Sequence, residues 1–279
     1  MRPKFSLILA TVGRTGEVQK FMESLVAQNY ADLELIVVDQ NDDNRLDSIL
    51  AMYANSLKIK KVTSERGLSR ARNVGLSYAS GEIICFPDDD CWYPPGLLNI
   101  VDRIFTESPD VAGITGRTTD GDGVEERRWP KEVKKITMTN IWRTAISFTI
   151  FLRRECVGST LVFNESLGVG AGTQWNSGEE TDLLMRVLKK GLCVKYRPDL
   201  CVFHPVKIDT MSEDQIQRAA SYSRGAGRVM RINSYPIVLV GVSMVKPLFM
   251  AIVNLLLLKY DRSRLYRHLF KNKILGFLD

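Results

Sequence analysis

Continuous apolar segments recur along the first part of the chain, and a stretch with helical spacing separates each from the next. Three of these segments cover residues 5–11, 33–39 and 83–86. A strand with one solvated face alternates apolar and polar side chains, whereas a strand covered on both faces does not. The pattern therefore predicts an α/β fold, with an open, mainly parallel sheet and helices on both faces.

The same periodicity predicts the other elements. Apolar side chains three or four positions apart indicate helices, and Gly81 and Gly191 follow two of them as stop signals. Residues 118–130 are polar and rich in glycine, which predicts a loop. We expect helices at 18–27, 47–53, 66–79, 97–105 and 218–231, a helix opened by residues 174–182 that runs to 188, and further strands at 58–63, 111–115, 146–152, 193–196 and 200–203.

The basic charge of the chain lies in its last part. Residues 218–279 contain eleven Lys and Arg against two acidic residues, a net charge of +9, so residues 1–217 carry −3 of the total of +6. A protein that binds nucleic acid is expected to be basic around its working surface. Because the larger part of the chain is acidic on balance, the charge distribution argues against nucleic acid as a partner.

Residues 236–258 are almost all apolar, with one interruption at Lys246 and Pro247. Each half is shorter than the ~20 apolar residues that span a bilayer, and the whole stretch barely reaches that length. Residues 259–273 are basic and carry aromatic side chains. This pattern favours a segment that lies on the anionic inner face of the plasma membrane. The alternative is a helical pair that packs on the preceding domain or on a second subunit of a homo-oligomer.

The length of 279 residues allows one large domain with an appendage. We expect a domain over 1–215, with halves of about 1–117 and 118–215, and a helical C-terminal segment over 216–279. The apolar run after Lys4 superficially resembles a signal peptide, but it is short and leads into Gly13 without a cleavage-site pattern. The five cysteines are odd in number and form no CxxC pair, which indicates a reduced, cytoplasmic location.

Three consecutive carboxylates, Asp88, Asp89 and Asp90, follow the predicted strand 83–86. Adjacent anions repel one another, so a chain that fixes three of them at the end of a strand needs a cation or a hydrogen-bonding ligand. Mg²⁺ and Mn²⁺ prefer oxygen ligands, and Mg²⁺ commonly takes one or two carboxylates plus substrate phosphates. The alternative is a solvated acidic turn, or a capping cluster for the helix that begins near residues 94–95.

Thr11 and Asp39 also stand at the ends of predicted strands. In open sheets of this kind, ligands bind outside the carboxyl ends of the strands. Asp39 is therefore placed to bind a nucleotide base or ribose, while a metal at the carboxylate triplet takes the phosphates. The alternative for Asp39 is a turn or helix cap.

A second acidic cluster, Glu179, Glu180 and Asp182, opens a predicted helix. Ser177 and Glu180 have the spacing of a capping box, which would make Glu180 structural. The helix dipole also favours an ionised carboxylate in the first turn, which is the state required of a general base that acts on a hydroxyl. His204 follows an apolar run and is a candidate ligand of metal or phosphate, although a lone histidine is more often structural.

Five segments in order resemble the inverting family 2 glycosyltransferases of the GT-A fold, especially bacterial capsule, O-antigen and exopolysaccharide transferases. The resemblance covers roughly the first three quarters of the chain, and its order makes it specific. The segments are Leu7-Ile-Leu-Ala-Thr11 with Arg14, Leu35-Ile-Val-Val-Asp39, Gly67-Leu-Ser-Arg-Ala-Arg-Asn-Val-Gly75, Gly81-Glu-Ile-Ile-Cys-Phe-Pro-Asp-Asp-Asp90 and Gly178-Glu-Glu-Thr-Asp-Leu-Leu-Met-Arg186.

The resemblance implies a metal-dependent, inverting transfer of a sugar from a nucleoside-diphosphate donor, here a UDP- or dTDP-sugar, to a hydroxyl of a glycan or lipid-linked oligosaccharide. Glu180 would be the catalytic base, with Glu179 as the alternative. Mn²⁺ or Mg²⁺ would be the cofactor. The other implied roles are donor binding by Thr11, Arg14, Asp39, Asn41, Arg66, Arg72, Asp88 and Asp89, metal binding by Asp90, Asp88 and His204, and acceptor contact by Trp175 and Asp182.

Two positions depart from the family pattern. Gln40-Asn41-Asp42 follows Asp39 where many relatives have Asp-Gly-Ser, which bears on the choice of nucleotide, and Pro87 stands where many relatives carry a further aspartate. Two other functions remain open from the residues alone. A sugar nucleotidyltransferase would also use strand-end carboxylates, but it needs a basic triphosphate loop where residues 12–16 offer only Arg14. A non-catalytic sugar-binding protein gives no reason for the acidic cluster at 179–182.

Overall fold

The computed structural model describes residues 4–125, 127–206 and 211–279. The chain divides into two compact units. Unit 1 comprises residues 1–66, 70–162 and 186–207, and unit 2 comprises residues 67–69, 163–185 and 208–279. The boundaries drawn from the sequence at 117/118 and 215/216 stay predictions.

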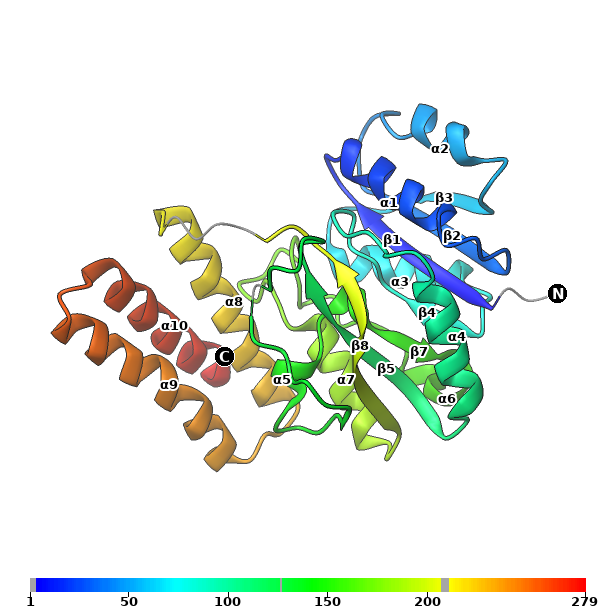
Figure 1. The fold of residues 1–279 in the computed structure, drawn as a ribbon. Helices are drawn as coiled ribbons and strands as arrows, with labels where there is room; N and C mark the ends of the chain where they lie inside the picture. Colours follow the sequence, from blue (N-terminus) through cyan, green and yellow to red (C-terminus); the bar gives the residue numbers. More distant parts are fainter. Residues whose placement is uncertain (1–3, 126, 207–210) are drawn as a thin grey trace. The chain divides into compact units, whose positions relative to one another are not determined.

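Unit 1 contains, over the described residues, a sheet of eight strands in the order β3-β2-β1-β4-β7-β5-β8-β6 (Figure 1). Strands β3, β2, β1 and β4 run parallel, and β5 and β8 form a second parallel pair. Strand β7 is antiparallel to both β4 and β5, and β6 is antiparallel to β8. The predicted mainly parallel sheet is confirmed. The bounds are β1 Phe5–Thr11, β2 Leu33–Asp39, β3 Ile59–Thr63, β4 Ile83–Cys85, β5 Val111–Thr119, β6 Lys134–Lys135, β7 Phe151–Arg153 and β8 Cys193–Phe203.

The continuous apolar runs form the central strands. Every residue of β1 and β2 is buried, as expected for strands covered on both faces. Their register pairs Thr11 with Asp39, so both side chains stand at the same edge of the sheet. An isolated bridge between Ala10 and Asp88 continues the pairing of β1 beyond β4. The carboxyl ends of three neighbouring strands therefore converge, as the sequence predicted.

Helices cover both faces of this sheet. Side chains of α1 and α4 share one hydrophobic core with Phe5, Leu7 and Leu9 of β1. Helix α3 lies on the opposite face, where a Cβ added to Gly75 would meet Ile8 Cγ2 at 2.4 Å. The helices of unit 1 are α1 Gly16–Val26, α2 Asp47–Tyr53, α4 Leu97–Glu107, α5 Ile141–Thr144 and α6 Arg154–Val157, and α3 Leu68–Tyr78 and α7 Glu179–Lys189 each run across the boundary between the units.

The strand predicted at 146–152 is wrong in its first half. Residues Ser147–Thr149 form a 3₁₀ turn, and only Phe151–Arg153 join the sheet as β7. The hydroxyl and the backbone N–H of Thr149 both donate to the carbonyl of Ile146, at 2.9 and 3.0 Å. These local bonds close the turn and take residues 147–149 out of the ladder.

Two other expectations change at β5 and β8. Strand β5 continues to Thr119, into the region predicted to be a loop from residue 118. The strand pieces predicted at 193–196 and 200–203 are one strand, β8, which pairs with β5 through a register shift between Thr115 and Arg117. The irregularity explains why the apolar pattern is broken at residues 197–199 although the strand is continuous.

Unit 2 contains three long helices, α8 Glu213–Ile232, α9 Ile237–Leu256 and α10 Tyr260–Leu278. Helix α10 packs against both α8 and α9 (Figure 1). Glycines permit close contact between α8 and α10: a Cβ on Gly227 would meet the carbonyl oxygen of Lys273 at 2.1 Å. A Cβ on Gly276 would meet the carbonyl oxygen of Arg224 at 1.9 Å.

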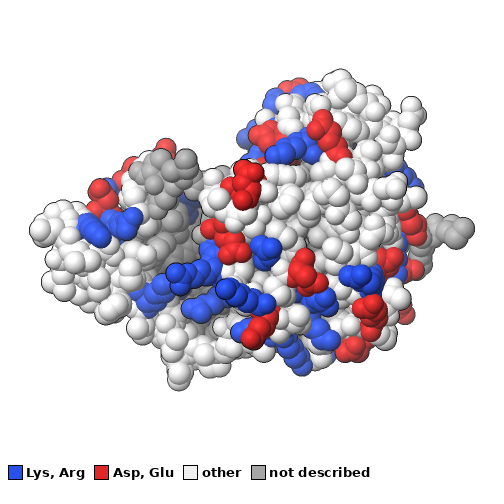
Figure 2. Space-filling view, viewed as in Figure 1, with Lys and Arg blue, Asp and Glu red and all other residues white. Residues whose placement is uncertain are grey.

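Helix α9 is continuous through Pro247, so the interruption expected at Lys246 and Pro247 does not divide it. Its buried side chains include Val240, Pro247, Ala251 and Asn254. The outer face is apolar and exposed, and in Figure 2 the surface at the lower left, where α9 lies, shows few charged side chains. Over the described residues, α9 alone has the length and apolar composition to cross a bilayer.

We expect Gly276→Ala to lower the melting temperature of the protein, because the added methyl group enters backbone at the α8–α10 crossing. Overpacking of this kind costs about 2 kcal/mol. Gly241→Ala in α9 is the matched control, since a Cβ there meets nothing within 4 Å. Alanine at this helical position should raise stability by about 1 kcal/mol. Equal melting temperatures for the two variants, measured by circular dichroism, would contradict the close crossing.

Candidate functional site

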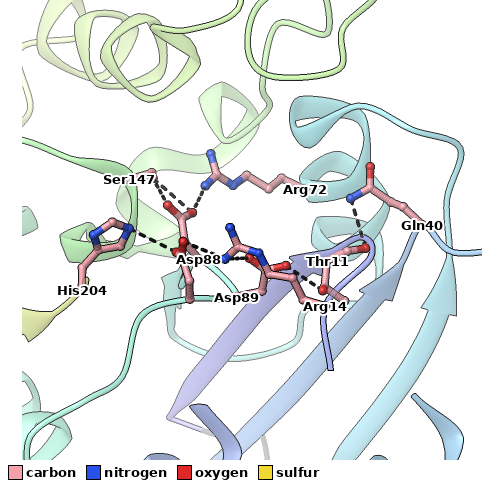
Figure 3. A network of polar contacts seen from close by, with 9 residues as sticks. Thr11, Arg14, Gln40, Arg72, Asp88, Asp89, Ser147 and His204 are labelled. Carbon is pink, nitrogen blue, oxygen red and sulfur yellow. Dashed lines mark hydrogen bonds and ion pairs between the residues drawn. The ribbon is translucent and has the colours of Figure 1, made fainter. Parts of the chain in front are cut away.

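The carboxylate triplet of unit 1 lies in a network of polar contacts beside the end of β1 (Figure 3). Thr11, the last residue of β1, donates its hydroxyl to Asp89 Oδ2 at 2.7 Å. Arg14, in the loop that follows, places Nη1 2.8 Å from Asp89 Oδ1 and 2.7 Å from Asp90 Oδ2. One guanidinium thus holds two neighbouring carboxylates together and offsets their mutual repulsion.

Asp88 is held from the other side by Arg72 of α3. Arg72 Nη2 lies 2.8 Å from Asp88 Oδ1, and the arginine side chain is 1% exposed. Ser147, in the turn before β7, also points toward this carboxylate, with Oγ 3.4 Å from Oδ1. A fully buried arginine needs a carboxylate partner, so the pair fixes the direction in which Asp88 faces.

Asp90 meets His204, which follows directly after β8. His204 Nε2 lies 3.2 Å from Asp90 Oδ1. The imidazole ring is stacked on Phe148, with ring centroids 4.9 Å apart and planes within 6°. The backbone N–H of His204 donates to the carbonyl of Thr119 at 2.8 Å, which fixes the histidine at the end of the β5–β8 pair. Two separate contacts therefore orient the ring toward Asp90.

The environment shifts the pKa values of Asp89 and Asp90 in opposite directions. Burial raises the pKa of Asp89 to about 6, although the Thr11 hydroxyl and the Arg14 charge act in the opposite direction. Burial acts on Asp90 as well, but the hydrogen bond and charge of His204, followed by those of Arg14, outweigh it and hold the pKa of Asp90 below its usual range. Asp90 is therefore ionised at neutral pH, as a metal ligand must be.

Asp39 lies at the end of β2 and is 1% exposed. Its Oδ1 accepts hydrogen bonds from the backbone and the side chain of Asn41, at 2.9 and 2.7 Å, and Lys61 Nζ lies 3.2 Å from Oδ2. Asn41 Oδ1 in turn accepts from the backbone N–H of Gly13 at 2.7 Å. Asn41 thus joins the loop after β2 to the loop after β1.

The structure separates Arg66 and Arg72, the two later arginines assigned to donor binding. Arg72 belongs to the network around the triplet, whereas Arg66 is exposed and is not among the described residues that pair with the carboxylates. Gln40, Ser147 and Phe148 were not predicted for the network. Gln40 adjoins Asp39 and donates from Nε2 to the carbonyl of Thr11 at 3.4 Å, while no sequence pattern marks Ser147.

Asp90 and His204 provide one carboxylate and one imidazole for a divalent cation. No group of three or more His, Cys, Asp and Glu suited to metal binding occurs among the residues described. Mg²⁺ is usually bound by one or two carboxylates together with substrate phosphates and water. Two protein ligands therefore fit an ion that shares its remaining positions with a diphosphate.

The second acidic cluster belongs to unit 2, at the start of α7. The helix begins at Glu179, and its first hydrogen bond runs from the N–H of Asp182 to the carbonyl of Gly178. The cap is therefore Gly178, with φ of +91°, and not Ser177, whose hydroxyl donates to the carbonyl of Tyr222 at 2.8 Å. Ser177 thus lies one residue before the cap position, which the capping-box spacing with Glu180 requires it to occupy.

The acidic side chains of α7 differ in exposure. Glu179 is 5% exposed, and a Cβ on Gly168 would meet its Oε2 at 3.2 Å. Asp182 is 4% exposed and accepts a hydrogen bond from Asn233 Nδ2 at 2.8 Å, a structural contact within unit 2. Glu180 is partly exposed, as a base that meets a substrate hydroxyl must be. The catalytic role of Glu180 and the acceptor role of Asp182 stay predictions.

Trp175 is fixed by two contacts within unit 2. Its Nε1 donates to Asp279 Oδ2 at 3.1 Å, and the guanidinium of Arg228 lies 4.3 Å above the ring. Arg224 holds the same Asp279 carboxylate, with bonds of 2.9 and 3.1 Å. The indole is therefore held in one orientation while remaining partly exposed, and its predicted acceptor contact is untested.

Comparison with known proteins gives a family model described as "Glycosyl transferase family 2", which matches residues 6–159. An uncharacterized glycosyltransferase of Nostoc sp. is 33% identical over 115 residues, which cover 40% of this chain and 35% of that protein. The poly(ribitol-phosphate) beta-N-acetylglucosaminyltransferase TarS of Staphylococcus aureus is 27% identical over 143 residues, 49% of this chain and 25% of that protein. The matched region thus spans about a third or less of either relative.

Solved structures share the fold. The mannosyltransferase PcManGT from Pyrobaculum calidifontis, in complex with GDP-Man and Mn²⁺, aligns with a TM-score of 0.66 at 16% identity, over 100% of this chain and 88% of that one. TarS 1–349 in complex with UDP-GlcNAc aligns with a TM-score of 0.64 at 17% identity, over 97% and 90%. At such identities the structural similarity establishes the GT-A fold alone. The chemistry has to be inferred from the residues of the site.

Proposed function

Because the chain belongs to glycosyl transferase family 2, we propose that it is a metal-dependent, inverting glycosyltransferase. It moves a sugar from a nucleoside-diphosphate donor to a hydroxyl of a glycan or a lipid-linked oligosaccharide. The convergence of Asp88, Asp89 and Asp90 with Arg14 and His204 carries the proposal. The donors in the two solved complexes, UDP-GlcNAc and GDP-Man, support the donor class, and we propose a UDP- or dTDP-sugar here.

The donor is bound at the carboxyl edge of the sheet in unit 1. Asp39 and Asn41 recognise the base, and Thr11 lies beside them at the end of β1. Asp88 or Asp89 binds the ribose, while Arg14 and Arg72 supply positive charge next to the phosphates. Such a cluster of preorganised charges is suited to a leaving group that gains negative charge as its bond to the sugar breaks.

Asp90 and His204 would hold the divalent ion, and Asp88 is the third candidate ligand. When bound, Mn²⁺ or Mg²⁺ acts as a Lewis acid toward the diphosphate. His204 contributes a donor or a ligand depending on its protonation, and the stacked Phe148 keeps the ring in place for either role. The Mn²⁺ in the PcManGT complex supports metal use by this architecture.

Glu180 acts as the general base. It accepts the proton of an acceptor hydroxyl as the hydroxyl oxygen forms a bond to the anomeric carbon. The bond between that carbon and the diphosphate breaks on the opposite face, and the nucleoside diphosphate leaves with the bonding electrons. The proton stays on Glu180 until it exchanges with water. One displacement inverts the anomeric configuration without a covalent sugar intermediate.

The residues that contact the acceptor belong to unit 2. We assign acceptor contact to Trp175, whose orientation is fixed by Asp279 and Arg228. Asp182, in the first turn of α7, is the second candidate for acceptor contact. We further propose that the enzyme works on the cytoplasmic face of the plasma membrane, bound through α9 and α10.

The test is nucleotide release from a panel of nucleotide sugars with Mn²⁺ and candidate acceptors. We expect release of a nucleoside diphosphate that depends on both the acceptor and the metal. Release of pyrophosphate would indicate a nucleotidyltransferase, and tight sugar binding without turnover would indicate a non-catalytic binding protein. Either result would replace the proposed activity.

Asn41→Ala should raise the KM for the donor about 30-fold and leave kcat nearly unchanged. The variant removes the two hydrogen bonds that join the Asn41 side chain to Gly13 and to Asp39. Loss of about 1 kcal/mol for each bond, about 2 kcal/mol together, corresponds to this change. Asn44→Ala, in the same loop, is the control because its side chain is exposed. An unchanged donor KM in Asn41→Ala would contradict the role of the joined loops.

A further inference from the structure

A cavity of about 360 Å³ lies among the three helices of unit 2. Its polar lining comes from Ser223 of α8, Ser243 and Lys246 of α9, and Tyr266 and Lys273 of α10. Alanine, leucine and proline side chains form the rest of the lining. The cavity thus combines two ammonium groups and three hydroxyl groups with an apolar wall.

Positive charge in this cavity has no acidic counterpart in its lining. None of the described residues that line it is Asp or Glu. The side chain of Lys273 is partly buried, and this burial lowers the pKa of its ammonium group. A desolvated cation is unfavourable without an anion nearby. The electrostatics therefore favour an anionic group from outside the chain.

Lys273 also has a structural role, which must be separated from ligand binding. Pro247 lacks an N–H, so the carbonyl of Ser243 loses its usual donor within α9. Lys273 Nζ lies 3.4 Å from this carbonyl oxygen. An ammonium has three N–H groups, so this long bond leaves others for a ligand. Lys246 lines the same cavity, and its side chain is exposed.

The outer face of α9 indicates which kind of anion reaches the cavity. The side chains of Ile237, Phe249 and Leu256 are 71%, 61% and 77% exposed, and they mark an apolar face along the whole helix. A second copy of the chain would bring another segment of charge +9 toward the first, which is unfavourable. An anionic bilayer complements both the apolar face and the positive charge.

We propose that the cavity binds the phosphate of an anionic membrane lipid, while the apolar face of α9 contacts the acyl chains. Lys246 and Lys273 hold the phosphate, and the Ser243 and Tyr266 hydroxyls lie within the same lining. This inference goes beyond the proposed transfer reaction, because it assigns a lipid headgroup site outside unit 1. It also specifies the residues through which the membrane is recognised.

The test is co-sedimentation with extruded vesicles of phosphatidylcholine, with and without phosphatidic acid. We expect the wild-type protein to bind the vesicles that contain phosphatidic acid. The double variant Lys246→Met/Lys273→Met should bind them at least tenfold more weakly. The control double variant Lys259→Met/Lys271→Met removes two exposed charges of the same segment. Its loss of vesicle binding should be severalfold smaller. Equal losses in the two double variants would show diffuse attraction only and overturn the site.

Two further arms complete the experiment. If Lys273→Met does not fold because it leaves the Ser243 carbonyl without a donor, Lys246→Met alone should still weaken vesicle binding severalfold. Unchanged vesicle binding by Lys246→Met would overturn the proposal. Displacement of the protein from the vesicles by millimolar inorganic phosphate at constant ionic strength would identify a free-phosphate site and overturn the lipid assignment. Nucleotide release with a soluble acceptor, measured on the same samples, separates failure of this site from failure of the proposed reaction.

Discussion

Asp90→Asn is expected to lower kcat/KM for the donor about 10³-fold, the upper end of the effect found when one preorganised contact to a transition state is removed. The carboxylate is held ionised by His204 and Arg14, and it faces both of them. An amide keeps the shape of the side chain but loses the charge that binds a divalent cation. The apparent affinity for Mn²⁺ should fall along with the rate.

The measurement is nucleotide release over a titration of Mn²⁺. Asp199→Asn serves as the control because Asp199 is a half-exposed carboxylate paired with Arg197 on β8. Its kinetics should match those of the wild type. Arg14 still pairs with Asp89 in Asp90→Asn, so the network should remain folded, and melting temperatures check this. A wild-type dependence on Mn²⁺ in Asp90→Asn would remove Asp90 from the metal site.

Glu180→Gln should lower kcat by about 10²–10⁴-fold, the contribution of one general base. The KM for the donor and the dependence on metal should change little, because the proposed role of Glu180 is proton transfer and not donor or metal binding. The amide cannot accept the hydroxyl proton. Calorimetry with the nucleoside diphosphate and Mn²⁺ should give the same affinity as the wild type, which separates a chemical defect from a binding defect.

Glu179→Gln distinguishes the two candidate bases. Glu179 is buried against Gly168, so its substitution should mainly lower stability. Glu107→Gln, at the exposed end of α4, is the matched control for loss of one carboxylate. If Glu179→Gln lost turnover at an unchanged melting temperature while Glu180→Gln kept it, the base would be Glu179.

The elements that the sequence predicted best are those whose signal is local. The bounds of β1, β2 and α2 agree with the predicted ranges, because continuous apolar runs and helical spacing depend on the segment itself. The strand predicted over 146–152 failed because hydrogen bonds to the carbonyl of Ile146 close a turn that apolar composition does not reveal. In α9, proline was expected to break the run, yet the helix continues past it.

For the candidate site too, the sequence predicted the features that depend on local segments and missed those that depend on distant contacts. Asp88, Asp89 and Asp90 could be proposed because they follow a buried strand, and the register of β1 and β2 brings Thr11 and Asp39 to the same edge. Burial of Asp182 could not be foreseen, since its partner Asn233 lies 51 residues further along the chain. Sequence patterns identify which groups are available, and the tertiary contacts decide their partners.

The reversed direction of β7 determines which segment of the chain contributes residues to this site. In a wholly parallel sheet, the segment that leads into a strand lies at the edge opposite to the binding site. Because β7 is antiparallel to β4, with Phe151 paired to Cys85, the segment leading into it reaches the binding edge. Ser147 and Phe148 contact Asp88 and His204 for this reason. Substitutions that alter specificity should accordingly be sought upstream of β7 and downstream of β4 and β5, which run antiparallel to it.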